Sequence, residues 1–118
     1  MKVLLIDDNQ DITSLLSKFL KAKGFESIVT NDPRDGLEQI KEGKYDVVLL
    51  DISMPEFSGI DIIQTLEEEQ ILRNQKIIVF SALTFANLQV PELLKKEGIH
   101  GYLKKPIQLK ELVTAITN

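Results

Sequence analysis

Short apolar runs alternate along the chain with segments whose apolar residues recur at helical spacing. The first run contains Val3-Leu4-Leu5-Ile6 with no polar alternation, a pattern typical of a strand covered on both faces. The run at residues 26–30 is flanked by polar residues, which predicts a strand at a sheet edge. The predicted strands are Lys2–Ile6, Glu26–Thr30, Asp46–Leu50, Lys76–Phe80 and Ile99–Leu103.

Helices are predicted between these strands and after the last one. Asn9 supplies an N-cap and Gly24 a stop for the first helix, while Pro33 and Gly43 mark the start and end of the second. The apolar faces of the four clear helices are formed by Ile12, Leu15, Leu16, Phe19 and Leu20; Leu37 and Ile40; Ile60, Ile63 and Leu66; and Leu109, Leu112, Val113 and Ile116.

The helical signal is broken in residues 83–97. Pro91 lies inside this segment, and proline is tolerated in the first turn of a helix but not in its interior. We therefore expect a short fourth helix over Pro91–Glu97. Strands that alternate with helices in this way predict an α/β fold, with a doubly wound, five-stranded parallel sheet and helices on both faces.

Composition restricts the function classes. The 118 residues, 43% hydrophobic and 27% charged, predict one globular domain over residues 1–118. The absence of cysteine excludes disulfides, zinc thiolate sites and cysteine nucleophiles, and the net charge of −4 disfavours direct nucleic-acid binding. Apolar runs reach only four residues, which predicts no membrane span and, without a signal peptide, a cytoplasmic location.

Polar residues close the apolar runs. Ligand sites of such sheets lie at the carboxyl ends of the strands. There the sequence places Asp7-Asp8, Asp51, Ser81 and Lys105. Taken alone, each residue is accounted for by turn or cap chemistry. Together they predict three carboxylates, a hydroxyl and an ammonium at one edge of the sheet.

Three adjacent carboxylates repel one another unless a positive charge lies between them. Oxygen ligands without histidine or cysteine suit Mg²⁺. A carboxylate beside Mg²⁺ and a lysine can attack a phosphoryl group and form an acyl phosphate. The pattern therefore indicates a magnesium-dependent phosphoryl-accepting site.

Five separated motifs make the whole chain resemble the receiver domains of response regulators. They are Asp7-Asp8; Asp51 with Met54-Pro55 and Gly59; Ser81-Ala82; Gly101-Tyr102; and Lys105-Pro106. The resemblance implies a flavodoxin-like fold with strand order 2-1-3-4-5. It also implies phosphorylation of Asp51, with Mg²⁺ held by Asp7, Asp8, Asp51 and the backbone carbonyl of Ser53.

The resemblance assigns further roles near the end of the chain. Ser81, where threonine is also common, would bond the phosphoryl group, and Tyr102 would turn inward as Ser81 moves. Lys105 would pair with the phosphoryl group, aimed by a cis bond to Pro106. Because successive strand residues point to opposite sides, Lys104 would then face solvent.

The function that we expect is a two-component signalling module that catalyses only its own phosphorylation and dephosphorylation. The phosphodonor would be a histidine kinase or a histidine phosphotransfer protein, because His100 starts a short strand and is expected to be structural or exposed. The chain ends with its last helix, so we expect output through an unidentified protein partner, as a monomer or a phosphorylation-dependent dimer. Ser53 would tune the rate of dephosphorylation.

Three alternatives remain at this point. The first is a phosphoryl shuttle in a multistep relay. The second is an aspartyl-phosphate phosphatase of the haloacid dehalogenase type, which would require an aspartate where this chain has Ser53. The third is a flavodoxin-type electron carrier, whose flavin phosphate would be repelled by Asp7 and Asp8.

Overall fold

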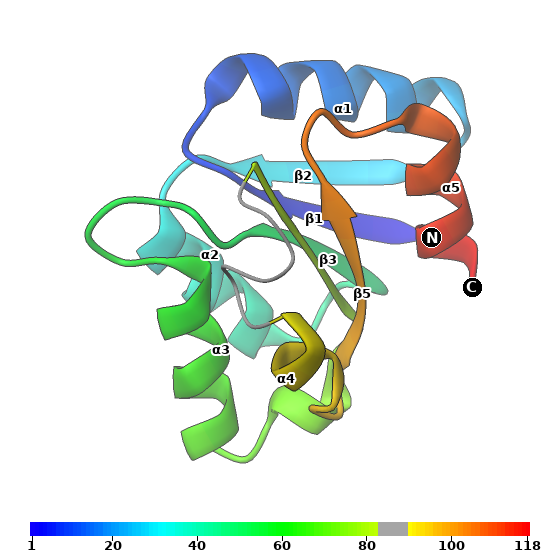
Figure 1. Ribbon diagram of the computed structural model, residues 1–118. Coiled ribbons are helices and arrows are strands. Elements are labelled where there is room, and N and C mark those ends of the chain that lie inside the picture. The colour runs from blue at the N-terminus through cyan, green and yellow to red at the C-terminus, as the bar shows by residue number, and fades with distance from the viewer. Residues whose placement is uncertain (83–89) are drawn as a thin grey trace.

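The computed structural model describes residues 1–82 and 90–118, and in it five strands alternate with helices (Figure 1). The strands are β1 (Lys2–Ile6), β2 (Glu26–Thr30), β3 (Val47–Asp51), β4 (Ile77–Ser81) and β5 (Ile99–Lys104). The helices are α1 (Gln10–Ala22), α2 (Pro33–Glu42), α3 (Gly59–Glu68), α4 (Val90–Leu94) and α5 (Leu109–Thr117), with a 3₁₀ turn, η1 (Leu72–Asn74). Within these residues, no helix has the length and apolar character that a membrane crossing requires.

The strands form one parallel sheet in the order β2-β1-β3-β4-β5. This order confirms the predicted α/β class and places β2 at an edge. Because the order reverses beside β1, the loops that follow β1 and β3 leave the same edge of the sheet next to each other. Ligands of open α/β sheets bind at such a switch point.

Helices cover both faces of the sheet, with α1 and α5 on one face and α2, α3 and α4 on the other (Figure 1). Side chains of each strand alternate between these faces. Val3 and Leu5 of β1 pack with Leu16 of α1 and its neighbours. Leu4 and Ile6 pack with the apolar sides of α2 and α3. Burial on both faces explains why β1 has no polar alternation.

Three strands, β3, β4 and β5, end one residue later than predicted, and β3 and β4 also begin one residue later. Asp51 is the last residue of β3 and lies opposite Phe80, and Ser81 is the last residue of β4 and lies opposite Lys104. The ladder continues past the apolar runs because the backbone still pairs, as the 3.2 Å bond from the Ile52 N–H to the Phe80 carbonyl shows. Both functional candidates therefore rest on paired, rigid backbone.

The predicted caps are present, but the fourth helix is displaced. Asn9 accepts hydrogen bonds from the first turn of α1, and Gly43 ends α2 in the left-handed conformation. The helix predicted over Pro91–Glu97 instead spans Val90–Leu94. It ends early because the next residues turn at Gly98, whose carbonyl accepts the Ile77 N–H at 2.7 Å. The rest of the broken segment, residues 83–89, lies outside the described residues.

Gly59 allows α3 to start directly against the end of β3. A Cβ atom at this position would lie 2.6 Å from the Asp51 carbonyl oxygen and 2.7 Å from the Ile52 Cα. Both neighbours are backbone atoms and cannot rotate away. The close approach holds the loop after β3 near the strand end that carries Asp51.

We predict that Gly59→Ala lowers the free energy of unfolding by about 1–3 kcal/mol, because overpacking against backbone outweighs the better helix propensity of alanine. The matched control is Gly101→Ala, since a Cβ there meets nothing within 4 Å. Urea denaturation followed by circular dichroism measures both. Equal stabilities for the two variants would contradict the close packing of α3 on β3.

Candidate functional site

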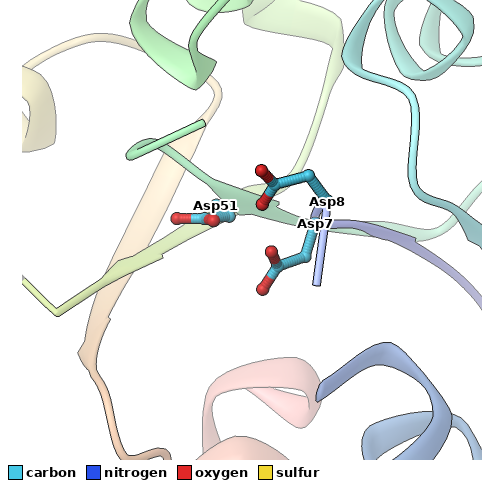
Figure 2. A group of neighbouring side chains, drawn as sticks. All are labelled: Asp7, Asp8 and Asp51. Carbon is cyan, nitrogen blue, oxygen red and sulfur yellow. The ribbon is translucent and has the colours of Figure 1, made fainter. Parts of the chain in front are cut away.

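Three carboxylates gather where β1 and β3 end (Figure 2). One oxygen atom from each of Asp7, Asp8 and Asp51 lies within 4.8 Å of the others. Asp7 and Asp51 are 0% and 2% exposed, whereas Asp8 is exposed. Asp7 and Asp8 follow β1 directly and Asp51 closes β3, so adjacent strands bring together residues that are far apart in the sequence.

Lys105 supplies the positive charge of the cluster. Its Nζ lies 3.0 Å from Asp7 Oδ2 and 3.4 Å from Asp51 Oδ2. Its backbone N–H donates to the Ser81 carbonyl at 2.8 Å, and its peptide bond to Pro106 is cis. Lys104 is exposed. The lysine that contacts the carboxylates is therefore the one directly before the proline.

Each of the two buried carboxylates contacts one backbone N–H group and the Lys105 ammonium. Asp7 Oδ1 accepts the Asn9 N–H at 3.0 Å, and Asp51 Oδ1 accepts the Ser53 N–H at 3.0 Å. The Oδ2 atom of each faces the Lys105 ammonium. Backbone donors thus fix the orientation of both carboxylates, and the ammonium offsets part of their charge.

Ser81 is fully buried beside these groups. Its hydroxyl hydrogen-bonds the hydroxyl of Ser53 in the loop after β3. This contact joins the end of β4 to the loop next to Asp51. The hydroxyl predicted for the site is therefore at the same sheet edge as the carboxylates and the ammonium.

Asn31 and Thr13 support the cluster, and the sequence reasoning missed both. The Asn31 side-chain amide donates to the Asp7 carbonyl at 2.7 Å and to Thr13 Oγ1 at 3.0 Å. Thr13 Oγ1 in turn donates to the Gln10 carbonyl at 3.2 Å. Together these bonds tie the loop after β2 to the turn that carries Asp7 and Asp8. Asn31 precedes a helix start, and a polar residue there is ordinary turn chemistry, so spacing alone did not single it out.

The sequence around this cluster matches a known protein family. The response regulator receiver domain family matches residues 3–117. The chain belongs to this family. Receiver domains are signalling modules rather than classical enzymes, and membership implies a histidine kinase as a partner.

Individual relatives agree along nearly the whole receiver domain. The chain is 29% identical over 114 residues to the polar-differentiation response regulator DivK of Brucella anthropi, and the alignment covers 97% of this chain and 91% of the relative. The receiver domain of the Francisella response regulator 1452 aligns with a TM-score of 0.85 and 30% identity, covering 98% of this chain and 93% of that one. Chemotaxis protein CheY4 of Vibrio cholerae shares the fold, with a TM-score of 0.83 at 24% identity and coverage of 98% and 95%.

Two residues of β5 also bear on the predictions, Tyr102 as a candidate for the switch and His100 as a residue expected outside the site. Tyr102 is opposite Val79 and is partly buried against the core on the α2 and α3 side; burial raises the pKa of its hydroxyl. His100 is exposed near the start of the same strand, as expected for a residue outside the site. The alternative of a haloacid dehalogenase type phosphatase conflicts with the family, and its second aspartate is replaced by Ser53.

Burial and mutual repulsion act on the acidic residues. Burial is the main cause that raises the pKa of Asp7, and the nearby Asp51 adds to it, while the Asn9 N–H and Lys105 oppose the rise. Desolvation followed by interaction with Asp7 raises the pKa of Asp8. For Asp7, burial and the neighbouring carboxylate therefore outweigh the opposing effects of the Asn9 N–H and the Lys105 ammonium on its pKa.

This donor set fits a hard divalent cation. The cluster offers carboxylate oxygens with no histidine or cysteine, which are ligands that Mg²⁺ accepts. Exposed Asp8 leaves room for the waters that Mg²⁺ retains. The acidic triad of this receiver domain can hold a metal ion.

We predict that Asp8→Asn stabilises the metal-free protein by about 1 kcal/mol or less, since exposed charges are screened by water. In wild type, Mg²⁺ should raise stability by about 2.7 kcal/mol at a hundredfold excess over its dissociation constant, and the variant should gain less. Thermal melts in EDTA and in Mg²⁺ measure both effects. A variant that is destabilised in EDTA, or that gains as much from Mg²⁺ as wild type, would refute a strained acidic metal site.

The same pKa shifts predict how the Asp8→Asn effect depends on pH. Because the folded pKa values of Asp7 and Asp8 are raised, the native state binds protons more tightly than the unfolded state. The stability that these carboxyls contribute is full below the unfolded pKa of about 4 and is lost as the pH rises through the folded pKa. In EDTA, the increase in melting temperature of Asp8→Asn over wild type should be largest at neutral pH and should vanish at about pH 4. An advantage that grows toward acid pH would contradict this sign.

Proposed function

We propose that this receiver domain accepts a phosphoryl group on Asp51 and thereby switches a protein-binding surface. The proposal rests on the burial and the contacts of the Asp51 carboxylate. It is almost fully buried, oriented by the Ser53 N–H through Oδ1, and faces the Lys105 ammonium through Oδ2. Of the three carboxylates, only Asp51 belongs to β3, the strand that pairs with the β4 strand of Ser81.

The transfer would form one bond and break one. An Asp51 carboxylate oxygen attacks the phosphorus atom of a phosphohistidine, the P–N bond breaks, and its electron pair stays on the imidazole nitrogen. The product on this chain is an aspartyl phosphate. Lys105 is placed to offset the charge of the phosphoryl oxygens, and Ser81 to donate a hydrogen bond to one of them.

The metal partner in this proposal is Mg²⁺, held by Asp7, Asp8, Asp51 and the backbone carbonyl of Ser53. When bound, it supplies positive charge at the oxygens that carry the transferred group. The turn after β1 and the loop after β3 bring these ligands together. Asn31 holds the first of these segments through the Asp7 carbonyl.

In this proposal, phosphorylation causes a conformational change that begins at Ser81 and continues to Tyr102. Ser81 leaves its bond to Ser53 for the phosphoryl group, and Tyr102 turns inward on β5. The surface formed by α4, β5 and α5 then changes its affinity for an output protein or for a second copy of the chain. The phosphodonor is a cytoplasmic histidine kinase or histidine phosphotransfer protein, and in a multistep relay the same aspartyl phosphate would pass its group onward.

We predict that Asp51→Asn abolishes labelling by acetyl phosphate and Mg²⁺, because the amide keeps the shape of the carboxylate but is not nucleophilic. Wild type should take up one phosphoryl group that is stable to acid and labile to base. The matched control is Asp46→Asn. Asp46 directly precedes the opposite end of β3, and its carboxylate accepts the Lys2 N–H at 2.7 Å.

Mass spectrometry and circular dichroism provide the measurements. Labelling of Asp51→Asn at the wild-type level would remove Asp51 from its role. Continuous release of inorganic phosphate without a labelled protein would support phosphatase chemistry instead. Loss of labelling in Asp46→Asn would show that uptake depends on general strand integrity.

A further inference from the structure

The loop between β3 and α3, residues 52–58, contains a strained turn at its centre. The Phe57 N–H donates to the Pro55 carbonyl at 2.7 Å, and Glu56 between them has a φ of 65°. A γ-turn with positive φ is rare and strained for a residue other than glycine. Such strain persists only where surrounding contacts hold it, and it occurs often at functional sites.

Both ends of this loop are anchored by hydrogen bonds. At one end the Ser53 N–H donates to Asp51 Oδ1. At the other end Ser58 and Asp61 form a capping box, in which the Ser58 N–H donates to Asp61 Oδ2 at 2.8 Å. Between these anchors, the backbone bond from Phe57 to Pro55 closes the turn at Glu56, and a side-chain contact can hold the turn further.

Arg34 provides such a contact from a different part of the chain. Its guanidinium carbon lies 4.5 Å from the centre of the Phe57 ring, and the ring is half-buried against the core. Arg34 stands in the first turn of α2, directly after the loop that follows β2. The stacked pair therefore bridges two loops at the carboxyl edge of the sheet.

The bridge lies beside the acidic cluster. A pocket of about 150 Å³ is lined by Asp8, by Arg34 and Phe57, and by Met54 and Pro55 of the loop. The contact that holds the strained turn thus shares a wall with one of the carboxylates. Among the described residues, the Arg34 guanidinium forms no ion pair, and it stacks on the Phe57 ring.

We propose that Arg34 is a positioning residue for the metal site: by stacking on Phe57 it holds the loop after β3 in the conformation that presents Ser53 to Mg²⁺. The inference rests on the proposed function, because it takes the Ser53 carbonyl as a ligand. Arg34, an exposed residue, would thus raise the affinity for Mg²⁺ without touching the metal.

The charge of Arg34 and its stacking on Phe57 predict opposite changes in Mg²⁺ affinity when Arg34 is removed. Arg34 is a cation near three carboxylates, so removing it should strengthen Mg²⁺ binding if it acted only through its field. Removing a stacking contact that holds the loop should weaken Mg²⁺ binding. The sign of the change in affinity separates the two.

The experiment measures Mg²⁺ dissociation constants of the full unphosphorylated chain by calorimetric titration, with melting temperatures in EDTA to confirm folding. Arg34→Ala should weaken Mg²⁺ binding by about two- to fivefold, the range that an exposed cation–π contact supplies. Phe57→Leu removes the ring without changing charge and should weaken binding similarly. Arg73→Ala is the matched control, since Arg73 lies in η1, outside the loops that form the site.

A double variant completes the test. Arg34→Ala with Phe57→Leu should lose no more affinity than either single variant, because both remove the same contact. Unchanged or tighter Mg²⁺ binding in Arg34→Ala would overturn the proposal, as would fully additive losses. If wild type itself binds no Mg²⁺, the proposed metal site fails rather than the role of Arg34 alone.

Discussion

The Lys105 ammonium lies between two buried carboxylates, 3.0 Å from Asp7 and 3.4 Å from Asp51. Without it, two like charges that are almost fully removed from water would face each other at the end of the sheet, an arrangement that opposes folding. The contact joins β5 to β1 and β3, on either side of the switch in strand order. The acidic edge can therefore exist in the folded protein and still retain unbalanced negative charge for a divalent cation.

The fold places these groups through the parallel sheet. Strands buried on both faces need apolar side chains throughout, so polar chemistry is confined to the residues at their ends. Gly59 lets α3 start against β3, and Asn31 ties the turn after β1 to the loop after β2. Rigid strands thus set the positions of Asp51 and Ser81, while loops set those of Asp8 and Ser53. This division suits a site in which the strand backbone stays fixed while side chains and loops respond to a ligand.

Most of the architecture was predictable because its signals are local. Continuous apolar runs identified β1, β3 and β4, and Asn9, Pro33 and Gly43 identified helix ends. The fourth helix was misplaced because the turn at Gly98 depends on a bond to Ile77, which lies far away in the sequence. The strand-end residues pointed to the acidic site, whereas the support from Asn31 and the stacking of Arg34 on Phe57 arise only when separate loops meet. Tertiary contacts of this kind leave no periodic pattern.

The most direct test of the account identifies the residue that carries the phosphoryl group. Reduction of the phosphorylated protein with borohydride converts an aspartyl phosphate to homoserine, and peptide mass spectrometry locates that residue. Phosphorylation of Asp51 predicts homoserine at position 51 alone, in amounts that follow the extent of phosphorylation. Homoserine at Asp7 or Asp8, or a phosphoryl group on His100, would contradict it.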